Sequence, residues 1–206
     1  MISVLLPSVR PGLLRRAYDS IAPAAGQVAF EVVIVADFGP EDWPQTKWII
    51  RERRGPIDAI SFAVREAAGD FLFLMNDEST LADGSLASLY YAALANPGRV
   101  QSPRWVPDYA LAYYGQSFVP FPFVHRDVVK QLGGFLDPAY RGFYADPDFS
   151  LRAHAKGVPV DVLPSAVIHH INGHDDVKAH NWAAYFDNDR ATFRTRWDHL
   201  GDFCDP

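Results

Sequence analysis

The amino-acid sequence predicts an α/β fold, in which one domain spanning residues 1–206 has a mixed, mostly parallel central sheet flanked by helices. Three observations predict it. Short runs at residues 2–6, 30–36 and 71–75 are apolar on both faces, which is typical of strands buried inside a parallel sheet. Segments with helical spacing of apolar residues lie between these runs. No linker, internal repeat or low-complexity tract divides the chain.

The first hundred residues alternate strands with helices. The opening apolar run ends at Pro7, and Pro11 suits the first turn of a helix, where its missing N–H costs nothing. Gly69 is expected to end a helix as its C-cap. The elements predicted here are a strand at 2–6, a helix at 11–21, strands at 30–36 and 47–50, a helix at 57–68, a strand at 71–75 and a helix at 84–95.

The second part of the chain is less regular. An aromatic stretch at 118–123 is interrupted by two prolines, which disfavour a central strand. Glycines follow the two short helices expected in this part. The predicted elements are strands at 100–105 and 109–114, helices at 127–132 and 147–156, strands at 158–163 and 166–169, and a final helix at 178–197.

The composition excludes several classes of protein. A formal net charge of -6 argues against general nucleic-acid binding, which depends on a basic surface. A single cysteine excludes a disulfide framework. No run approaches the roughly 20 apolar residues that span a bilayer, and no leader peptide is visible. We therefore expect a cytoplasmic protein, with peripheral membrane contact left open. The basic run Arg51, Arg53 and Arg54 is expected to be a solvated face.

Polar residues follow the ends of the predicted strands. Residues 7–10 follow the first strand, Asp37 follows the second, and residues 76–78 follow the strand at 71–75. Ligands of open parallel sheets bind outside the carboxyl ends of the strands. Acidic groups alone would repel a phosphate there, but a hard divalent cation binds carboxylates and phosphates together. The pattern therefore predicts a metal-assisted phosphate site at this edge.

Five blocks of sequence carry a more specific resemblance, and they run in family order over nearly all of the chain. They are ISVLLPSVRP, EVVIVADFGPED, GPIDAISFAVREAAGDFLFLMNDEST, GGFLDPAYRGFYADPDFSLRAHAKG and PSAVIHHINGH. Together they resemble family 2 glycosyltransferases, which have the GT-A fold. The resemblance implies an inverting, hexosyltransferase-type enzyme. Such an enzyme moves a sugar from a nucleotide-diphosphate sugar, most often a UDP-sugar, to a saccharide, lipid-linked or other hydroxyl acceptor.

The resemblance also implies roles for individual residues and for Mn²⁺ or Mg²⁺ on the diphosphate. Residues 1–100 would form the donor half and residues 101–206 the acceptor half. Asp146 would be the general base, and Arg152 would pair with Asp148 one helical turn away to support the acceptor side. The donor would be bound by Pro7, Ser8, Arg10, Asp37, Asn76 and Asp77, and the metal by Asp77, Glu78 and His170.

The chain departs from the family pattern at two positions. Asn76 stands where the first aspartate of the DxD metal-binding motif is usual, and Ala145 stands where the acidic pair usually has a glutamate. These changes keep open the alternative of a non-catalytic sugar-nucleotide-binding module. A sugar nucleotidyltransferase is a further alternative, although the first loop has only one glycine and one arginine.

Structural roles compete with the functional ones at several residues. Asp146 precedes Pro147 and suits the N-cap of a helix equally well. His169 is the alternative to His170 as the late metal ligand. Aromatic residues near 113–123 could stack on an acceptor sugar, but core packing explains most of them. The final helix is expected to pack on the domain through an amphipathic face.

Overall fold

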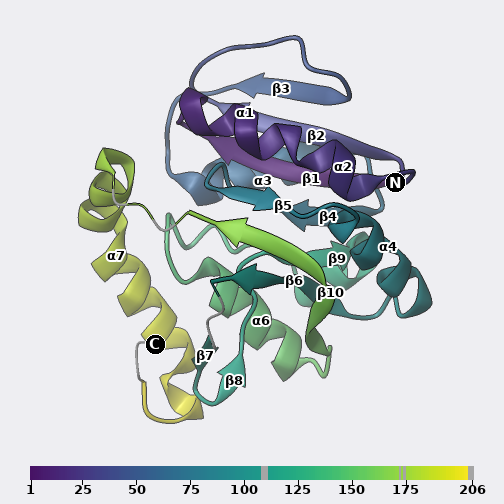
Figure 1. The fold of residues 1–206 in the computed structure, drawn as a ribbon. Coiled ribbons are helices and arrows are strands. Elements are labelled where there is room, and N and C mark those ends of the chain that lie inside the picture. Colours follow the sequence, from purple (N-terminus) through teal and green to yellow (C-terminus); the bar gives the residue numbers. More distant parts are fainter. Residues whose placement is uncertain (108–110, 172, 174, 204–206) are drawn as a thin grey trace.

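The computed structural model describes residues 1–107, 111–171, 173 and 175–203. One eight-stranded sheet runs through the middle of the molecule, in the order β3-β2-β1-β4-β9-β6-β10-β5 (Figure 1). Most neighbouring strands are parallel, while β9 is antiparallel to β4 and β6, and β5 is antiparallel to β10. The α/β class and the mixed, mostly parallel sheet are therefore confirmed.

The strands of this sheet are β1 (Ile2–Ser8), β2 (Phe30–Ala36), β3 (Thr46–Ile50), β4 (Phe71–Leu74), β5 (Ser79–Leu81), β6 (Val100–Val106), β9 (Phe123–His125) and β10 (Val160–His170). A small hairpin pairs β7 (Ala112–Tyr113) with β8 (Gln116–Ser117). The helices are α1 (Pro11–Asp19), α2 (Ile21–Ala25), α3 (Pro56–Glu66), α4 (Ser85–Ala95), α5 (Arg126–Leu132), α6 (Ala145–Ala155) and α7 (Asp176–Trp197), followed by a 3-10 turn at Asp198–Leu200.

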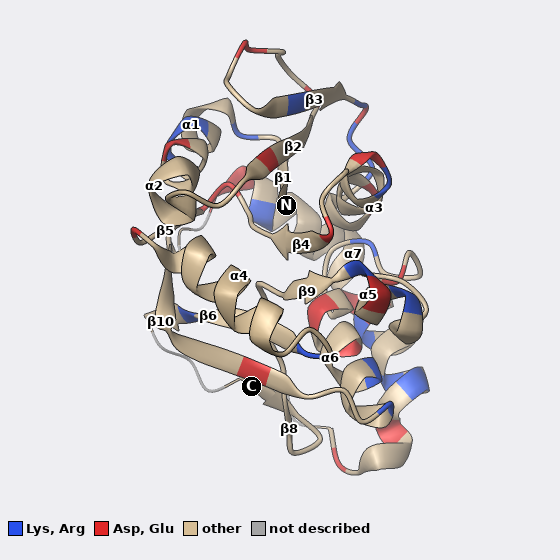
Figure 2. Cartoon of the chain, turned by 90° about the vertical axis from the view of Figure 1, so that its right-hand side faces the viewer, with Lys and Arg blue, Asp and Glu red and all other residues tan. Residues whose placement is uncertain are grey.

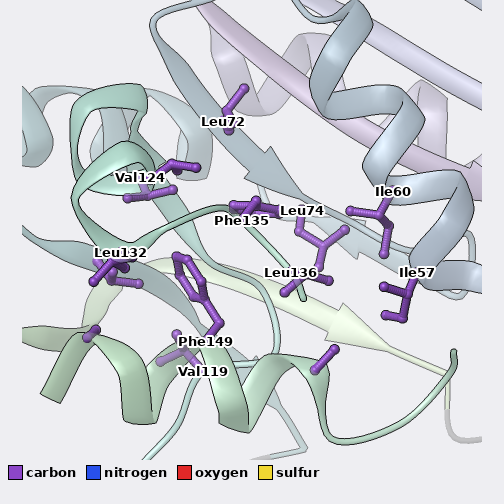
Figure 3. Close-up of a cluster of buried hydrophobic side chains, with 14 of the residues drawn as sticks. Ile57, Ile60, Leu72, Leu74, Val119, Val124, Leu132, Phe135, Leu136 and Phe149 are labelled. Carbon is purple, nitrogen blue, oxygen red and sulfur yellow. The ribbon is translucent and has the colours of Figure 1, made fainter. Parts of the chain in front are cut away.

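Alternation along the strands divides the core into two layers. In β1, Val4 and Leu6 pack with the residues of α1, α2 and α4 on one face, while Leu5 packs toward α3 on the other. The second layer also contains buried residues of α5, α6 and α7. Figure 3 shows Leu132 of α5 and Phe149 of α6 among its side chains. Because both faces are covered by helices, the strands β1, β2 and β4 are mostly apolar on both faces, as the sequence indicates.

Several elements differ from the sequence prediction. The first helix breaks at Ser20, which is both the C-cap of α1 and the N-cap of α2. The two strands expected at 158–163 and 166–169 form the single strand β10, which stays paired with β6 through a shift in register between Leu163 and Val167. Such a bulge accommodates Pro164, which lacks a backbone donor. Of the strand expected at 109–114, residues 109–110 lie outside the described residues and 112–113 form β7.

The helix α3 ends before the glycine expected to cap it. Its C-cap is Ala67, in extended conformation, and Gly69 does not have a positive φ. Gly69 serves a different purpose, because a Cβ there would lie 2.7 Å from Ser3 Oγ and 2.8 Å from the Met1 carbonyl oxygen. The glycine is therefore required by close packing against β1.

The helix α4 differs from the others in its surface. Its sequence SLASLYYAALA has no charged residue, and Figure 2 shows it without any blue or red segment. Tyr91 and Leu94 of this helix are more than half exposed. None of the helices in the described part of the chain has the length and apolar character needed to cross a membrane.

Candidate functional site

A cavity of about 380 Å³ opens where β1, β2, β4 and β10 end. These strands run in the same direction, so their carboxyl ends meet at one edge of the sheet. Residues at or just after the end of each strand line the cavity. The rest of its wall comes from residues 51–56, from Asp58 and Ala59 of α3, from residues 142–143 and from the first turns of α7. The cavity lies at the position where open parallel sheets bind ligands.

The turn after β4 carries the acidic part of the site. Asp77 and Glu78 are 5% and 6% exposed, although both carry carboxylates. The chain then enters β5, whose Ser79 pairs with His170 at the end of β10. This antiparallel pairing brings together residues that are far apart in the sequence, so that Glu78 Oε2 lies 3.5 Å from His170 Nε2.

Arg10 is the centre of an ion-pair cluster in the cavity. Its guanidinium nitrogens lie 3.0 Å from Asp77 Oδ1 and 3.0 Å from Glu78 Oε1. It also donates to both oxygens of Asp175, at 2.6 and 3.1 Å. Lys178 Nζ lies 2.9 Å from Glu78 Oε2. Two cations thus pair with three carboxylates from the end of β4 and the start of α7, which lowers the cost of burying the acidic pair.

The protonation of this cluster follows from burial and pairing. Burial raises the pKa of Asp77 even though Ser8 and Arg10 donate hydrogen bonds to its carboxylate. At Arg10, burial acts to lower the pKa, but the hydrogen bond to Asp175 and the nearby carboxylates raise it overall. The hydrogen bond from Arg10 lowers the pKa of Asp175 to about 2. Arg10 and Asp175 therefore form a charged pair at neutral pH.

Eight of the predicted site residues line this one cavity, and they come from four strand ends. They are Pro7, Ser8, Arg10, Asp37, Asn76, Asp77, Glu78 and His170. His170 has a side chain that is only 10% exposed, whereas His169 is exposed, since successive residues of a strand point to opposite faces. Of the two histidines, His170 is therefore the one that faces the acidic pair.

The predicted base, Asp146, does not line the cavity among the residues described. It lies in the first turn of α6, and the N-cap of that helix is Tyr144, so the capping role expected for Asp146 is wrong. Apart from its own backbone N–H, no described group donates to its carboxylate. The loss of hydration raises its pKa to about 7. The segment just before α6, at Gly142 and Phe143, does line the cavity.

The ion pair expected between Asp148 and Arg152 is present, with Arg152 Nε donating to Asp148 Oδ2 at 2.8 Å. Asp148 is fully buried and also accepts from Trp197 and Arg196 of α7 and from the Tyr140 hydroxyl. Arg152 in turn donates to three carbonyl groups in the segment that ends α5 and follows it, those of Leu132, Gly134 and Phe135. The pair thus joins α6 to α7 and to this segment, away from the cavity lining.

Several cavity residues are not identified by the sequence. The basic run Arg51, Arg53 and Arg54 lines the cavity, and Arg53 and Arg54 are exposed, so the solvated face that the sequence predicts is also part of the cavity wall. Asp175 and Lys178 enter from the N-terminal end of α7, where Asp175 is the N-cap. An aspartate before a helix is a readable N-cap signal, but nothing local in the sequence indicates its contact with Arg10, 165 residues earlier.

The aromatic stretch near residues 113–123 belongs to the core. Tyr113, Phe121 and Phe123 are at most 8% exposed, so none of these three rings offers a free face to a sugar. Tyr113 packs with Phe118, Tyr144 and Phe193. The core-packing interpretation is therefore the one that the structure supports.

The residue types at the acidic turn suit a hard cation, because two carboxylates and an imidazole converge there. In the arrangement described, however, each carboxylate oxygen has a partner, namely Ser8, Arg10, Lys178 or His170. Within the described ranges, no three acidic, histidine or cysteine side chains are set to hold a metal ion. Metal binding at Asp77 and Glu78 therefore requires Arg10 or Lys178 to move.

Comparison of the sequence with protein-family models gives no match, and comparison with curated proteins gives none either. Comparison of the structures gives clear likenesses. A crystal structure of GalNAc-T7 with UDP, GalNAc and Mn²⁺ superposes with a TM-score of 0.70 at 15% identity, covering 98% of this chain and 52% of that one. A structure of S. aureus TarS has a TM-score of 0.63 at 16% identity, covering 96% of this chain and 43% of that one.

A third likeness is to the mannosyltransferase PcManGT from Pyrobaculum calidifontis in complex with GDP-Man and Mn²⁺. Its TM-score is 0.70 at 15% identity, and the match covers 98% of this chain and 65% of that one. The chain thus spans 43% to 65% of the length of these structures. At such identities the likeness establishes the architecture alone. The chain has the GT-A fold.

Proposed function

We propose that the protein is an inverting glycosyltransferase that moves a sugar from a nucleotide-diphosphate sugar, with a UDP-sugar favoured, to an acceptor hydroxyl. The observation that carries the proposal is the cavity at the carboxyl ends of the strands, which gathers residues from four strand ends around one ion-pair cluster. The GT-A fold supports it, and two of the structural neighbours were solved with UDP or GDP-Man and Mn²⁺. The family 2 resemblance of the sequence agrees with this proposal.

The cavity offers groups for each part of such a donor. Asp37, at the end of β2, would accept hydrogen bonds from the nucleoside. The negative charge of a diphosphate would be met by Arg10 and Lys178, and by the basic residues at 51–54 on the opposite wall. Arginine suits this task because its planar guanidinium binds phosphate oxygens in pairs. The cations would exchange their present carboxylate partners for the phosphates.

A divalent cation, Mn²⁺ or Mg²⁺, would be held by Asp77, Glu78 and His170 once Arg10 and Lys178 turn to the diphosphate. When bound, such a cation neutralises the leaving diphosphate as a Lewis acid. Because Asp77 and Glu78 are already paired, the metal alone competes with two resident cations. We therefore expect metal and nucleotide to bind together more strongly than either binds alone.

Asp146 is proposed as the general base that takes the proton of the acceptor hydroxyl. A base works best when its pKa lies near the working pH, and desolvation raises the pKa of this carboxyl to about 7. Its helix follows directly on the cavity-lining residues Gly142 and Phe143. The second candidate function is a non-catalytic sugar-nucleotide-binding module, and the position of Asp146 outside the cavity lining favours it.

Titration calorimetry with UDP, GDP and their sugar conjugates, with and without Mn²⁺, tests the donor site. We expect a nucleotide diphosphate to bind more tightly with Mn²⁺ present. Failure of every nucleotide to bind would refute the proposal. The variant Asp146→Asn separates the two candidate functions, because the enzyme should keep donor binding and lose sugar transfer and donor hydrolysis. If the wild-type protein binds donors but neither transfers nor hydrolyses the sugar, this result would favour the binding module.

A further inference from the structure

An exposed aromatic cluster lies on α7 beside the cavity. Trp182 is 57% exposed, although tryptophan is usually well buried. Its ring stacks on Phe186 one helical turn later, with centroids 3.8 Å apart and planes tilted by 12°. Phe143 meets both rings edge to face, at 5.5 and 5.4 Å. We name these three residues, Phe143, Trp182 and Phe186, the Trp182 platform.

Hydrogen bonds to Asp189 hold the segment that carries Phe143 against α7. Asp189, on the same side of α7, is fully buried and accepts backbone hydrogen bonds from residues 141–143, at 2.8 to 3.1 Å. Gly142 lies so close to Tyr185 that an added Cβ would be 3.1 Å from its ring. The segment that carries Phe143 is thus fixed to α7. A preorganised aromatic surface loses little conformational entropy when a ligand binds.

The platform continues the wall of the proposed donor cavity. Phe143 lines that cavity itself. Asn181, the neighbour of Trp182, also lines it and accepts a hydrogen bond of 3.1 Å from Arg53 on the opposite wall. Lys178, one helical turn before Trp182, contacts Glu78 in the acidic turn. A ligand resting on Trp182 would therefore adjoin whatever the cavity holds.

The chemistry of this surface fits a sugar ring. One face of a pyranose presents polarised C–H bonds, which pack on the negative face of an aromatic ring, while its hydroxyl groups need polar partners at the edge. Asn181, the residue before Trp182, and its hydrogen-bond donor Arg53 offer polar side chains at the adjoining cavity wall. An anionic membrane surface fits less well, since the exposed residues Asp176 and Asp187 also lie on α7.

We propose that the Trp182 platform is the binding site for a saccharide acceptor, with the sugar ring stacked on the indole and its hydroxyl groups turned toward the donor cavity. This proposal rests on the glycosyltransferase function proposed above, and it identifies the acceptor as a carbohydrate. It also assigns acceptor binding to α7 in place of the aromatic residues at 113–123, of which Tyr113, Phe121 and Phe123 are buried.

Saturation-transfer-difference NMR with four hexasaccharides, of β1,4-glucose, β1,4-N-acetylglucosamine, α1,4-glucose and α1,6-mannose, tests the proposal with the intact protein. We expect at least one of them to bind, with saturation concentrated on the C–H groups of one ring face. Trp182→Ala should weaken that binding about tenfold or more, and Trp182→Phe should restore part of it. The matched control is Tyr91→Ala, which removes an aromatic side chain 60% exposed on α4 and should leave binding unchanged.

Calorimetry with UDP and Mn²⁺ on the same variants separates the two proposals. If the wild type binds no nucleotide, the donor function itself fails. If it binds nucleotide but no hexasaccharide, or if Trp182→Ala binds the same hexasaccharide with wild-type affinity, the platform is not an acceptor site. A third outcome is that the wild type sediments with phosphatidylglycerol vesicles, that Trp182→Ala does not, and that neither protein binds a saccharide. This result would identify a membrane contact and would also overturn the proposal.

Discussion

Replacing Asp146 with asparagine should stabilise the protein, and the gain should grow with pH. The carboxyl of Asp146 has lost hydration, and the only donor to it in the described chain is its own backbone N–H. Its pKa is raised from 3.8 to about 7. The folded protein therefore holds this proton more tightly than the unfolded chain, and ionising the carboxyl costs free energy of folding.

The sign and size follow from linkage. A raised carboxyl pKa makes a contribution to stability that is complete below pH 3.8 and is lost as the pH rises to about 7. The interval is about three pH units, and each unit corresponds to about 1.4 kcal/mol, so the full loss is about 4 kcal/mol. The asparagine side chain of the variant has no charge to bury. The difference in unfolding free energy between Asp146→Asn and the wild type should thus increase by about 2 to 3 kcal/mol between pH 5 and pH 8.

Urea denaturation of both proteins at pH 5, 6, 7 and 8 measures this difference, and the other titrating groups cancel in the comparison. Asp127→Asn is the control, because Lys130 lowers the pKa of that exposed carboxyl, and its variant should show no gain as the pH rises above 5. A constant difference between Asp146→Asn and the wild type from pH 5 to pH 8 would refute the reasoning, since it would mean that Asp146 titrates in its ordinary range.

Four further predictions concern activity and packing. If Asp146 is the base, kcat/KM for sugar transfer should rise with pH and level off above about pH 7, as a pH profile would show. Arg10→Gln should lower the unfolding free energy by about 2 to 4 kcal/mol, because two buried carboxylates lose their partner, and calorimetry should show weakened UDP binding. Gly55→Ala should cost about 1 to 3 kcal/mol in urea denaturation, since φ is +97° and the new Cβ would lie 2.7 Å from the Arg141 carbonyl oxygen. Asp189→Asn should cost about 1 to 3 kcal/mol by the same assay, because one buried carboxylate oxygen accepts from three backbone N–H groups and a neutral amide lacks the charge that strengthens these hydrogen bonds.

Much of the fold could be predicted because the signals are local. The strand β2 has the predicted bounds, since its apolar run is closed by a turn cluster at Asp37. The strands β5 and β9 could not be predicted, because each has only three residues and depends on pairing with distant strands. Pro164 suggests a break between two strands, whereas the bulge in β10 absorbs it.

The candidate site also contains residues that could be predicted from local sequence and residues that could not. The residues after β1, β2 and β4 could be placed from the topology rule, because each follows its own strand directly. Contacts between distant segments could not, as Arg53 reaches Asn181 across 128 residues. In the sequence, the basic residues at 51–54 are typical of an ordinary exposed surface. Nothing in the local pattern indicates that they line the cavity. Asp146 could be found from the family pattern, but its unusual pKa depends on packing that only the structure shows.

The order of the strands has a consequence for how the molecule can be divided. The strand β5 comes from the first hundred residues but hydrogen-bonds to β10, and β9 from the later part inserts between β4 and β6. A break near residue 100 would leave β4 with an open edge and β5 without its neighbour. Residues 1–100 and residues 101–206 therefore share one sheet, and neither fragment contains a complete sheet of its own.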